Sequence, residues 1–162
     1  MSRAEHMTLE RIVVGVDLTD SGRLLLDWST RFSRTTKAEE LAVVHAYRGS
    51  VLNDGDDDAR ESLRTQRLLD LFRFLGTAEL NGMACTPIVE ESFAPHRVLA
   101  RVAQERGAGL LIIGDSGGSA RTARQLARNS LVPLLQIPLP AGHRSLKRAL
   151  KRIFSEDEPM FN

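Results

Sequence analysis

A glycine-rich turn carries the clearest chemical signal in this sequence. The apolar run 110–113 ends in Gly114-Asp115-Ser116-Gly117-Gly118-Ser119, and a helical pattern follows directly. Backbone N–H groups in such a turn, together with the amino end of the next helix, form a site that suits an anion. The same letters contain Gly-x-Ser-x-Gly, the pattern of a hydrolase nucleophile turn. The turn is therefore interpreted as a phosphate-binding loop, a nucleophile site at Ser116 or a structural connection.

The nucleophile interpretation lacks partner residues in the sequence. A hydrolase built around Ser116 needs an acid and then a histidine later in the chain. The histidine after Ser116, His143, precedes the acids of that region, which are Glu156, Asp157 and Glu158. We therefore predict no catalytic residue and expect that the chain is not an enzyme. Serine hydrolase chemistry at Ser116 stays as the second alternative.

Three further residues have side chains that could bind a ligand or a metal ion. Asp17 directly follows the first apolar run, where it either contacts a ligand or caps the next helix. His45 lies late in a second apolar run, which favours a hydrogen-bonded core histidine over a metal ligand. Cys85 lies in a third run and is expected to pack as a small apolar side chain. The histidines and this cysteine lack ligand spacing, so no metal site is predicted.

Five apolar runs are expected to position these residues. They span residues 11–16, 41–46, 84–90, 110–113 and 132–137, and helical patterns separate them. This alternation predicts an α/β fold, a five-stranded parallel sheet with helices on both faces. Ligands of such sheets bind beyond the carboxyl ends of the strands. Asp17, residues 46–48 and the glycine turn follow strands one, two and four, so they form the predicted ligand edge.

The second helix of this pattern follows a polar loop at residues 53–58. Aspartates at the end of the loop suit the amino end of a helix. The helix is expected to end at Asn81-Gly82. Its predicted buried stripe consists of Leu68, Leu71, Phe72 and Leu75.

Length and charge narrow the possible classes of protein. A chain of 162 residues forms one domain, and its net charge of +1 gives no general attraction to nucleic acid. The single cysteine excludes an internal disulfide. No run approaches the roughly 20 apolar residues that span a bilayer, and the polar start of the chain lacks a signal sequence. We expect a cytoplasmic protein without a transmembrane segment.

The ends of the chain differ from the repeating strand and helix pattern. Residues 1–10 form an N-terminal extension, residues 11–138 the domain and residues 139–162 a basic amphipathic C-terminal tail. The tail places Leu146, Leu150, Ile153 and Phe154 on one side, amid lysines and arginines, before residues 156–158 reverse the charge. It is expected to dock onto the domain or a dimer partner, or to bind a protein partner.

Several segments together resemble the universal stress protein family. They are the opening Ile-Val-Val-Gly-Val-Asp, Leu-Ala-Val-Val-His-Ala at strand two, residues 107–114 and Val132-Pro133-Leu134-Leu135. The similarity runs from about Arg11 to Pro138. It implies the adenine nucleotide alpha hydrolase-like fold, a Rossmann-like sandwich, with dimerisation often made through the last strand. It also implies a stress-linked role in the cytoplasm.

The resemblance also implies a nucleotide site, because some members of the family bind ATP. Those members use an aspartate after strand one, a small apolar residue after strand two, and Gly-x-x-Gly, nine residues, then Gly-Ser/Thr. Matching or substitute positions here are Asp17, Ala46, Gly114, Gly117, Gly118 and Ser119. The second half of the motif is missing, since Ala127 and Arg128 stand where it would fall. Gly118-Ser119 is the nearest substitute.

These observations favour a regulatory, stress-response protein that acts through dimerisation and protein contacts, with a shortened nucleotide loop. The homodimer would form through the last predicted strand, Val132 to Ile137. The alternative is a switch that binds ATP or AMP through the retained Gly-x-x-Gly turn, with Mg²⁺ as a companion ion.

Overall fold

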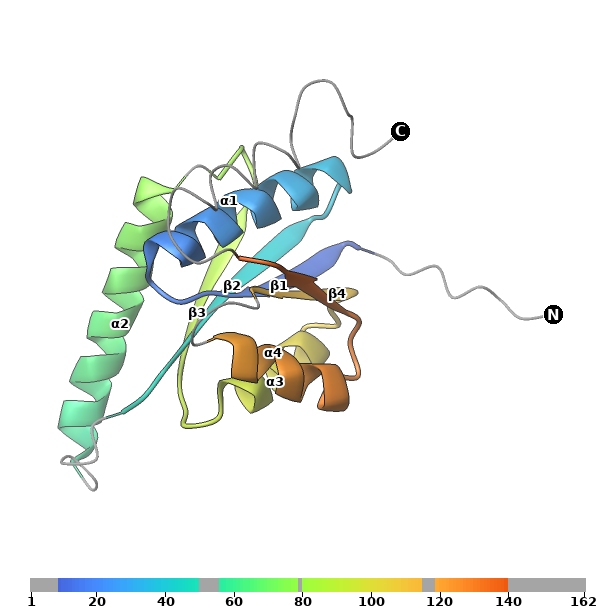
Figure 1. Ribbon diagram of the computed structural model, residues 1–162. Helices are drawn as coiled ribbons and strands as arrows, with labels where there is room; N and C mark the ends of the chain where they lie inside the picture. The colour runs from blue at the N-terminus through green and yellow to red at the C-terminus, as the bar shows by residue number, and fades with distance from the viewer. Residues whose placement is uncertain (1–8, 50–55, 79, 115–118, 140–162) are drawn as a thin grey trace.

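The computed structural model describes residues 9–49, 56–78, 80–114 and 119–139, without the side chains of residues 119 and 120. Within these residues a five-stranded parallel sheet has the order β3-β2-β1-β4-β5 (Figure 1). The strands are β1 (Arg11–Gly15), β2 (Glu40–Tyr47), β3 (Cys85–Glu91), β4 (Leu110–Gly114) and β5 (Leu134–Ile137). The helices are α1 (Asp20–Thr35), α2 (Asp57–Thr77), α3 (Pro95–Glu105) and α4 (Ser119–Asn129). The predicted fold class is confirmed.

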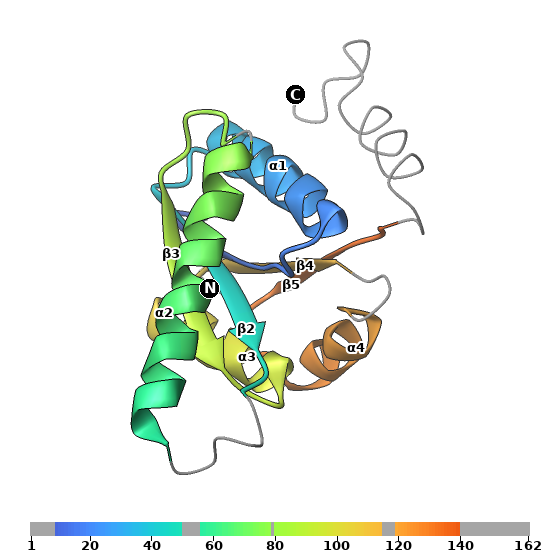
Figure 2. The same ribbon diagram turned by 90° about the vertical axis from the view of Figure 1, so that its left-hand side faces the viewer.

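The sheet separates two hydrophobic cores. Helices α1 and α2 lie over one face and α3 and α4 over the other, as Figures 1 and 2 show from two sides. Side chains along a strand alternate between the faces, so Ile12 and Val14 join the core under α1 and α2 while Val13 joins the opposite core. Because both faces are covered, the four residues from Ile12 to Gly15 are all buried.

The order of the strands places β1 in the middle of the sheet. The chain runs from β1 outward through β2 to β3, and then crosses back to pair β4 with the other side of β1. The winding direction therefore reverses between β1 and β4. A parallel sheet offers its ligand crevice at this point, beyond the carboxyl ends of the strands.

The buried stripe of α2 was predicted correctly except at one position. Leu71 is fully buried, and Leu75 and Leu68 also pack against the core, but Phe72 is 53% exposed. Phe74, at 5% exposure, takes the place that the prediction gave to Phe72. Position 74 lies three residues after Leu71 and shares its face of the helix, whereas Phe72 is turned away by about 100°.

The ends of the helices follow ordinary capping chemistry. The side chain of Asp56 accepts a hydrogen bond of 3.0 Å from the N–H of Ala59 and so caps α2, as the aspartate-rich loop predicted. The helix ends at Thr77, before the predicted stop. Asn81 and Gly82 instead turn the chain toward β3, with φ of +54° and +73°.

The two edges of the sheet differ. Strand β3 forms one edge and carries Pro87, whose backbone nitrogen has no hydrogen to donate, opposite Val43. Strand β5 forms the other edge and contains no proline. Beyond β5 the described chain reaches Leu139, which is 7% exposed and packs into the core under α1.

The described helices include none with the length and apolar composition to cross a membrane. The predicted terminal segments, apart from residues 9, 10 and 139, lie outside the described residues.

Candidate functional site

A cavity of about 240 Å³ opens at the predicted ligand edge of the sheet, on the face covered by α3 and α4. It lies at the carboxyl ends of β1, β2 and β4, where the winding direction reverses. Asp17 and Ala46, both predicted as site residues, lie in its wall. The full lining consists of Gly15, Val16, Asp17, Val44, Ala46, Pro95, Leu99, Ile113 and Thr122. The structure therefore brings residues from five different elements and their adjoining turns around one small space.

Asp17 is held in place at the end of β1. Its carboxylate accepts a hydrogen bond from the hydroxyl of Thr19. Thr19, not Asp17, caps α1, because its oxygen accepts from the N–H of Gly22 at 3.2 Å. A Cβ on Gly22 would stand 2.0 Å from the carbonyl oxygen of Asp17, so the first turn of α1 lies directly against this residue. The capping alternative for Asp17 is wrong, and its exposed carboxylate lies at the cavity.

Ala46 and His45 lie on opposite faces of β2. Ala46 lines the cavity, and its single methyl group leaves room there. His45 points to the other face, where its Nδ1 lies 3.1 Å from the carbonyl oxygen of Val16. That oxygen accepts only, so Nδ1 carries the proton. Burial lowers the pKa of His45, while the hydrogen bond to Val16 raises it less. The prediction of a hydrogen-bonded core histidine is confirmed.

Leu99 forms an apolar part of the cavity wall because Gly15 has no side chain. A Cβ on Gly15 would stand 2.8 and 2.9 Å from the two methyl carbons of Leu99. The cavity wall combines such apolar side chains with two polar ones within the described residues, the Asp17 carboxylate and the Thr122 hydroxyl. An apolar slot with a few polar groups is the usual composition of a small-molecule site.

Positive charge lies beside the cavity at the start of α3. His96 follows Pro95 of the cavity wall, and its pKa is lowered by burial and by the charges of Arg97 and Arg121. Its Nδ1 is shielded from solvent and has no hydrogen-bond partner among the described residues. Arg121 is exposed on α4, next to Thr122 of the cavity wall. A ligand with an apolar body and an anionic end fits this distribution of charge.

A model of the universal stress protein family matches residues 8–138. The chain belongs to the universal stress protein family. A comparison with curated protein sequences finds no match.

Solved structures of universal stress proteins share this fold. A universal stress protein in complex with cAMP is 22% identical, with a TM-score of 0.56 and coverage of 81% of this chain and 98% of that one. A family member from Burkholderia pseudomallei is 24% identical, with a TM-score of 0.58 over 82% and 98% of the two chains. One from Arabidopsis thaliana with AMP bound is 14% identical, with a TM-score of 0.58 over 83% and 97%.

The glycine turn of this universal stress protein is only partly described. Gly117 and Gly118, predicted to hold a ligand, lie outside the described residues, as does Ser116 of the hydrolase alternative. Ser119 begins α4, without a described side chain. Gly114 ends β4, and a Cβ there would point at Leu139 and Leu25 under α1, away from the cavity. The glycine is therefore explained by packing.

Sequence reasoning missed the three helical residues of the site, which are Pro95, Leu99 and Thr122. Pro95 and Leu99 come from α3, and neither belongs to the predicted ligand edge. Thr122 comes from α4, where it lines the cavity and the neighbouring Arg121 does not. All three come from helices, whereas the strand ends alone guided the prediction. Among the residues that the structure describes, no cluster of three metal-ligating side chains occurs.

Proposed function

We propose that this universal stress protein is a regulatory protein that binds an adenosine monophosphate in the cavity beside Asp17 and Ala46. The observation that carries the proposal is that both residues line one cavity at the reversal point of the sheet. The apolar wall around Ala46 and Leu99 suits the adenine and ribose, and Asp17 offers a carboxylate to hydroxyl or amino donors. The related structures with cAMP and AMP support the choice of an adenine nucleotide.

A monophosphate is favoured over a triphosphate by the length of the turn after β4. Four residues separate Gly114 from Ser119, where α4 begins. Positions 127 and 128 fall inside α4, so the second half of the glycine motif has no loop to occupy. A short turn leaves few backbone N–H groups to surround three phosphates. The cavity of about 240 Å³ is also smaller than the roughly 300–1,000 Å³ typical of ligand sites.

In this proposal the protein regulates by binding the nucleotide and performs no catalysis of its own. Nucleotide occupancy would change its contacts with a second copy or with another protein of the cytoplasm. The exposed edge of β5 and the tail at residues 139–162 are the proposed contact regions. Mg²⁺ is not required for a monophosphate, whose lower charge Arg97 and Arg121 can balance.

Calorimetric titration with AMP and with ATP, each with and without Mg²⁺, tests this proposal. We expect saturable AMP binding in the micromolar range and at least tenfold weaker binding of ATP. Ala46→Leu fills the cavity and should weaken AMP binding at least tenfold. Ala84→Leu is the matched control, because Ala84 is exposed outside the cavity. Absence of AMP binding up to millimolar concentration, or equal affinity in the two variants, would overturn the proposal.

A further inference from the structure

A second hollow lies on the other face of the molecule, between α1 and α2. We name it the α1–α2 groove, and it has a volume of about 380 Å³. Figures 1 and 2 show these two helices together on the face of the sheet opposite α3 and α4. The groove is lined by Leu18, Arg23, Arg67, Asp70, Arg73, Phe74 and Thr77. It shares no residue with the cavity beside Asp17.

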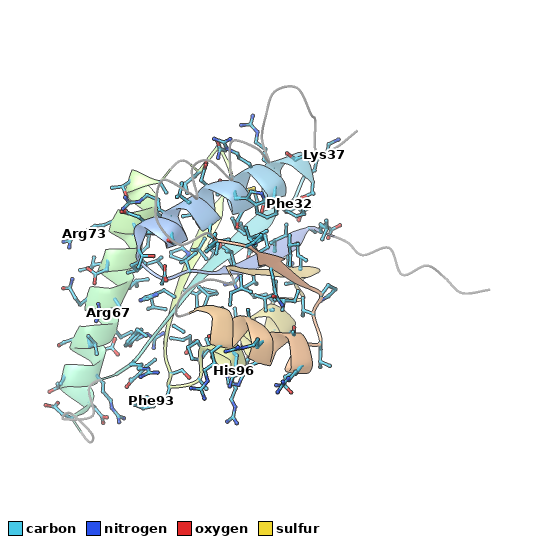
Figure 3. The ribbon with its side chains drawn as sticks, in the orientation of Figure 1. Phe32, Lys37, Arg67, Arg73, Phe93 and His96 are labelled. Carbon is cyan, nitrogen blue, oxygen red and sulfur yellow. The ribbon has the colours of Figure 1, made fainter. Side chains whose placement is uncertain are left out.

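The α1–α2 groove contains more positive than negative charge. Three arginines line it, Arg23 from α1 and Arg67 and Arg73 from α2, the last two labelled in Figure 3. Asp70 is the one acid of its lining and lies 3.5 Å from Arg67 and 3.9 Å from Arg73. Asp20, outside the lining, pairs with Arg23 at 3.6 Å. Among the residues that the structure describes, three guanidinium groups thus share two carboxylates, which leaves an excess of one positive charge.

Arg67, one of the residues that line the groove, has an unpartnered donor. Its Nη1 contacts Asp70, but its Nε is shielded from solvent and has no hydrogen-bond partner among the described residues. Asp70 also accepts a 2.9 Å hydrogen bond from Gln66, so its oxygens are shared by several donors. A shielded donor without a partner is unfavourable, and an acceptor that enters beside it removes that cost.

The floor of the groove holds the arginines in position. The guanidinium of Arg23 lies over the ring of Phe74, 5.5 Å from its centroid. Such stacking restricts a guanidinium while leaving its N–H edges free for an anion. Phe74 is itself buried in the core, so the ring is a fixed support.

We propose that the α1–α2 groove is a second anion site, in which Arg67, Arg73 and Arg23 bind a phosphate group. Phosphate fits better than a carboxylate because it carries up to two charges and presents three oxygens to the three guanidinium forks. Arg67 Nε donates to one of these oxygens. The source of the group is either inorganic phosphate or a small phosphate monoester, for which the adjacent Leu18 offers an apolar contact.

The Nε–H resonance of Arg67 provides a local probe of this site by NMR. The full chain is titrated with inorganic phosphate, glycerol phosphate and, as a neutral control, glycerol. We expect a saturable shift of this resonance with phosphate. The Arg67 variants lack this group, so their binding is followed through the backbone amide resonances of Phe74 and Thr77, which should report about tenfold weaker binding in Arg67→Met. Arg67→Lys keeps the charge but loses the guanidinium fork, so its affinity for phosphate should fall between those of the unsubstituted protein and Arg67→Met. Arg128→Met is the matched control, because Arg128 is exposed on α4.

Each outcome distinguishes this site from its alternatives. Tighter binding of glycerol phosphate than of inorganic phosphate identifies a monoester as the ligand. Equal affinities in Arg67→Met and Arg128→Met, or no shift with any phosphate, overturn the proposal. The Arg67 Nε–H resonance can also be recorded after Glu156, Asp157 and Glu158 are neutralised by substitution. If this resonance shifts on neutralisation but does not respond to phosphate, the groove binds the tail and the proposal of a phosphate site is overturned. AMP binding in the cavity beside Asp17 is measured separately, from the shift of the backbone amide resonance of Thr122.

Discussion

Leu139 lies directly over Gly114, so that a Cβ atom on the glycine would stand 2.2 Å from the Leu139 Cδ1 atom. Gly114 begins the glycine turn for which the sequence predicts an anion site. Its lack of a side chain admits Leu139, the residue with which the chain leaves the sheet, into the core under α1. The most conspicuous glycine of the sequence is thus required for packing at the end of β4.

Replacing Gly114 by alanine should therefore destabilise the protein. We expect Gly114→Ala to lower the free energy of unfolding by about 1–3 kcal/mol, because Leu139 must move out of a packed position. Urea denaturation followed by circular dichroism measures the change. Gly76→Ala is the control, since no atom lies within 4 Å of the added methyl group. It should stabilise the helix by about 0.4–1 kcal/mol. Equal effects of the two substitutions would contradict the packing account.

His45 should make stability depend on pH in the mildly acidic range. Burial lowers its pKa in the folded protein below the ordinary value of 6.5. The unfolded chain therefore binds a proton more readily, and stability falls as the pH drops from about 6.5 toward the folded pKa. Urea midpoints measured from pH 7.5 to 5.5 should decrease, and less so in His45→Gln. The amide of glutamine can still donate to the carbonyl of Val16. Identical pH profiles would contradict this role.

Cys85 should react slowly with alkylating reagents in the folded protein. Burial raises the pKa of its thiol from 9.0 to about 11, so roughly a hundredfold less thiolate is present at pH 8. Alkylation by iodoacetamide, followed by mass spectrometry, should be slower by about that factor than after unfolding in guanidinium chloride. Similar rates in the two conditions would show that the thiol of β3 is open to reagents.

Association through β5 should be sensitive to a charge introduced just before that strand begins. Leu131 lies three residues before β5 and is 81% exposed, which leaves a large apolar side chain in water. If copies pair along β5, Leu131→Glu should weaken the dimer at least tenfold, as measured by analytical ultracentrifugation. Phe93→Glu is the matched control, because Phe93 is 67% exposed beside α3. Equal dimer affinity in both variants would place the interface elsewhere.

The sequence predicted the strands well because burial on both faces leaves nearly continuous apolar runs. Residues 110–113, for example, are all buried in β4, and their burial needs no knowledge of their neighbours. The helices were harder. Phe72 and Phe74 differ by only two positions, and either one satisfies an apolar pattern, so the tertiary packing decides which of them is buried.

The site was predictable only where a strand ends. Asp17 and Ala46 were found because their strands are adjacent in the sheet and end at the same edge. Thr122 and Leu99 reach the cavity through the packing of α3 and α4, which depends on distances that no local pattern contains. The α1–α2 groove was not predicted from the sequence for the same reason, because Arg23 and Arg67 come from separate helices and belong to no common motif.

Pro87 makes the two edges of this sheet unequal in their ability to pair with an additional strand. Because its nitrogen cannot donate, β3 cannot offer an uninterrupted ladder to an additional strand. Strand β5 contains no such interruption. A second copy that joins at β5 therefore uses up the permissive edge of both molecules and leaves each with its blocked edge outward. Assembly of this kind along the sheet would close at two subunits and would not extend into an open-ended fibre.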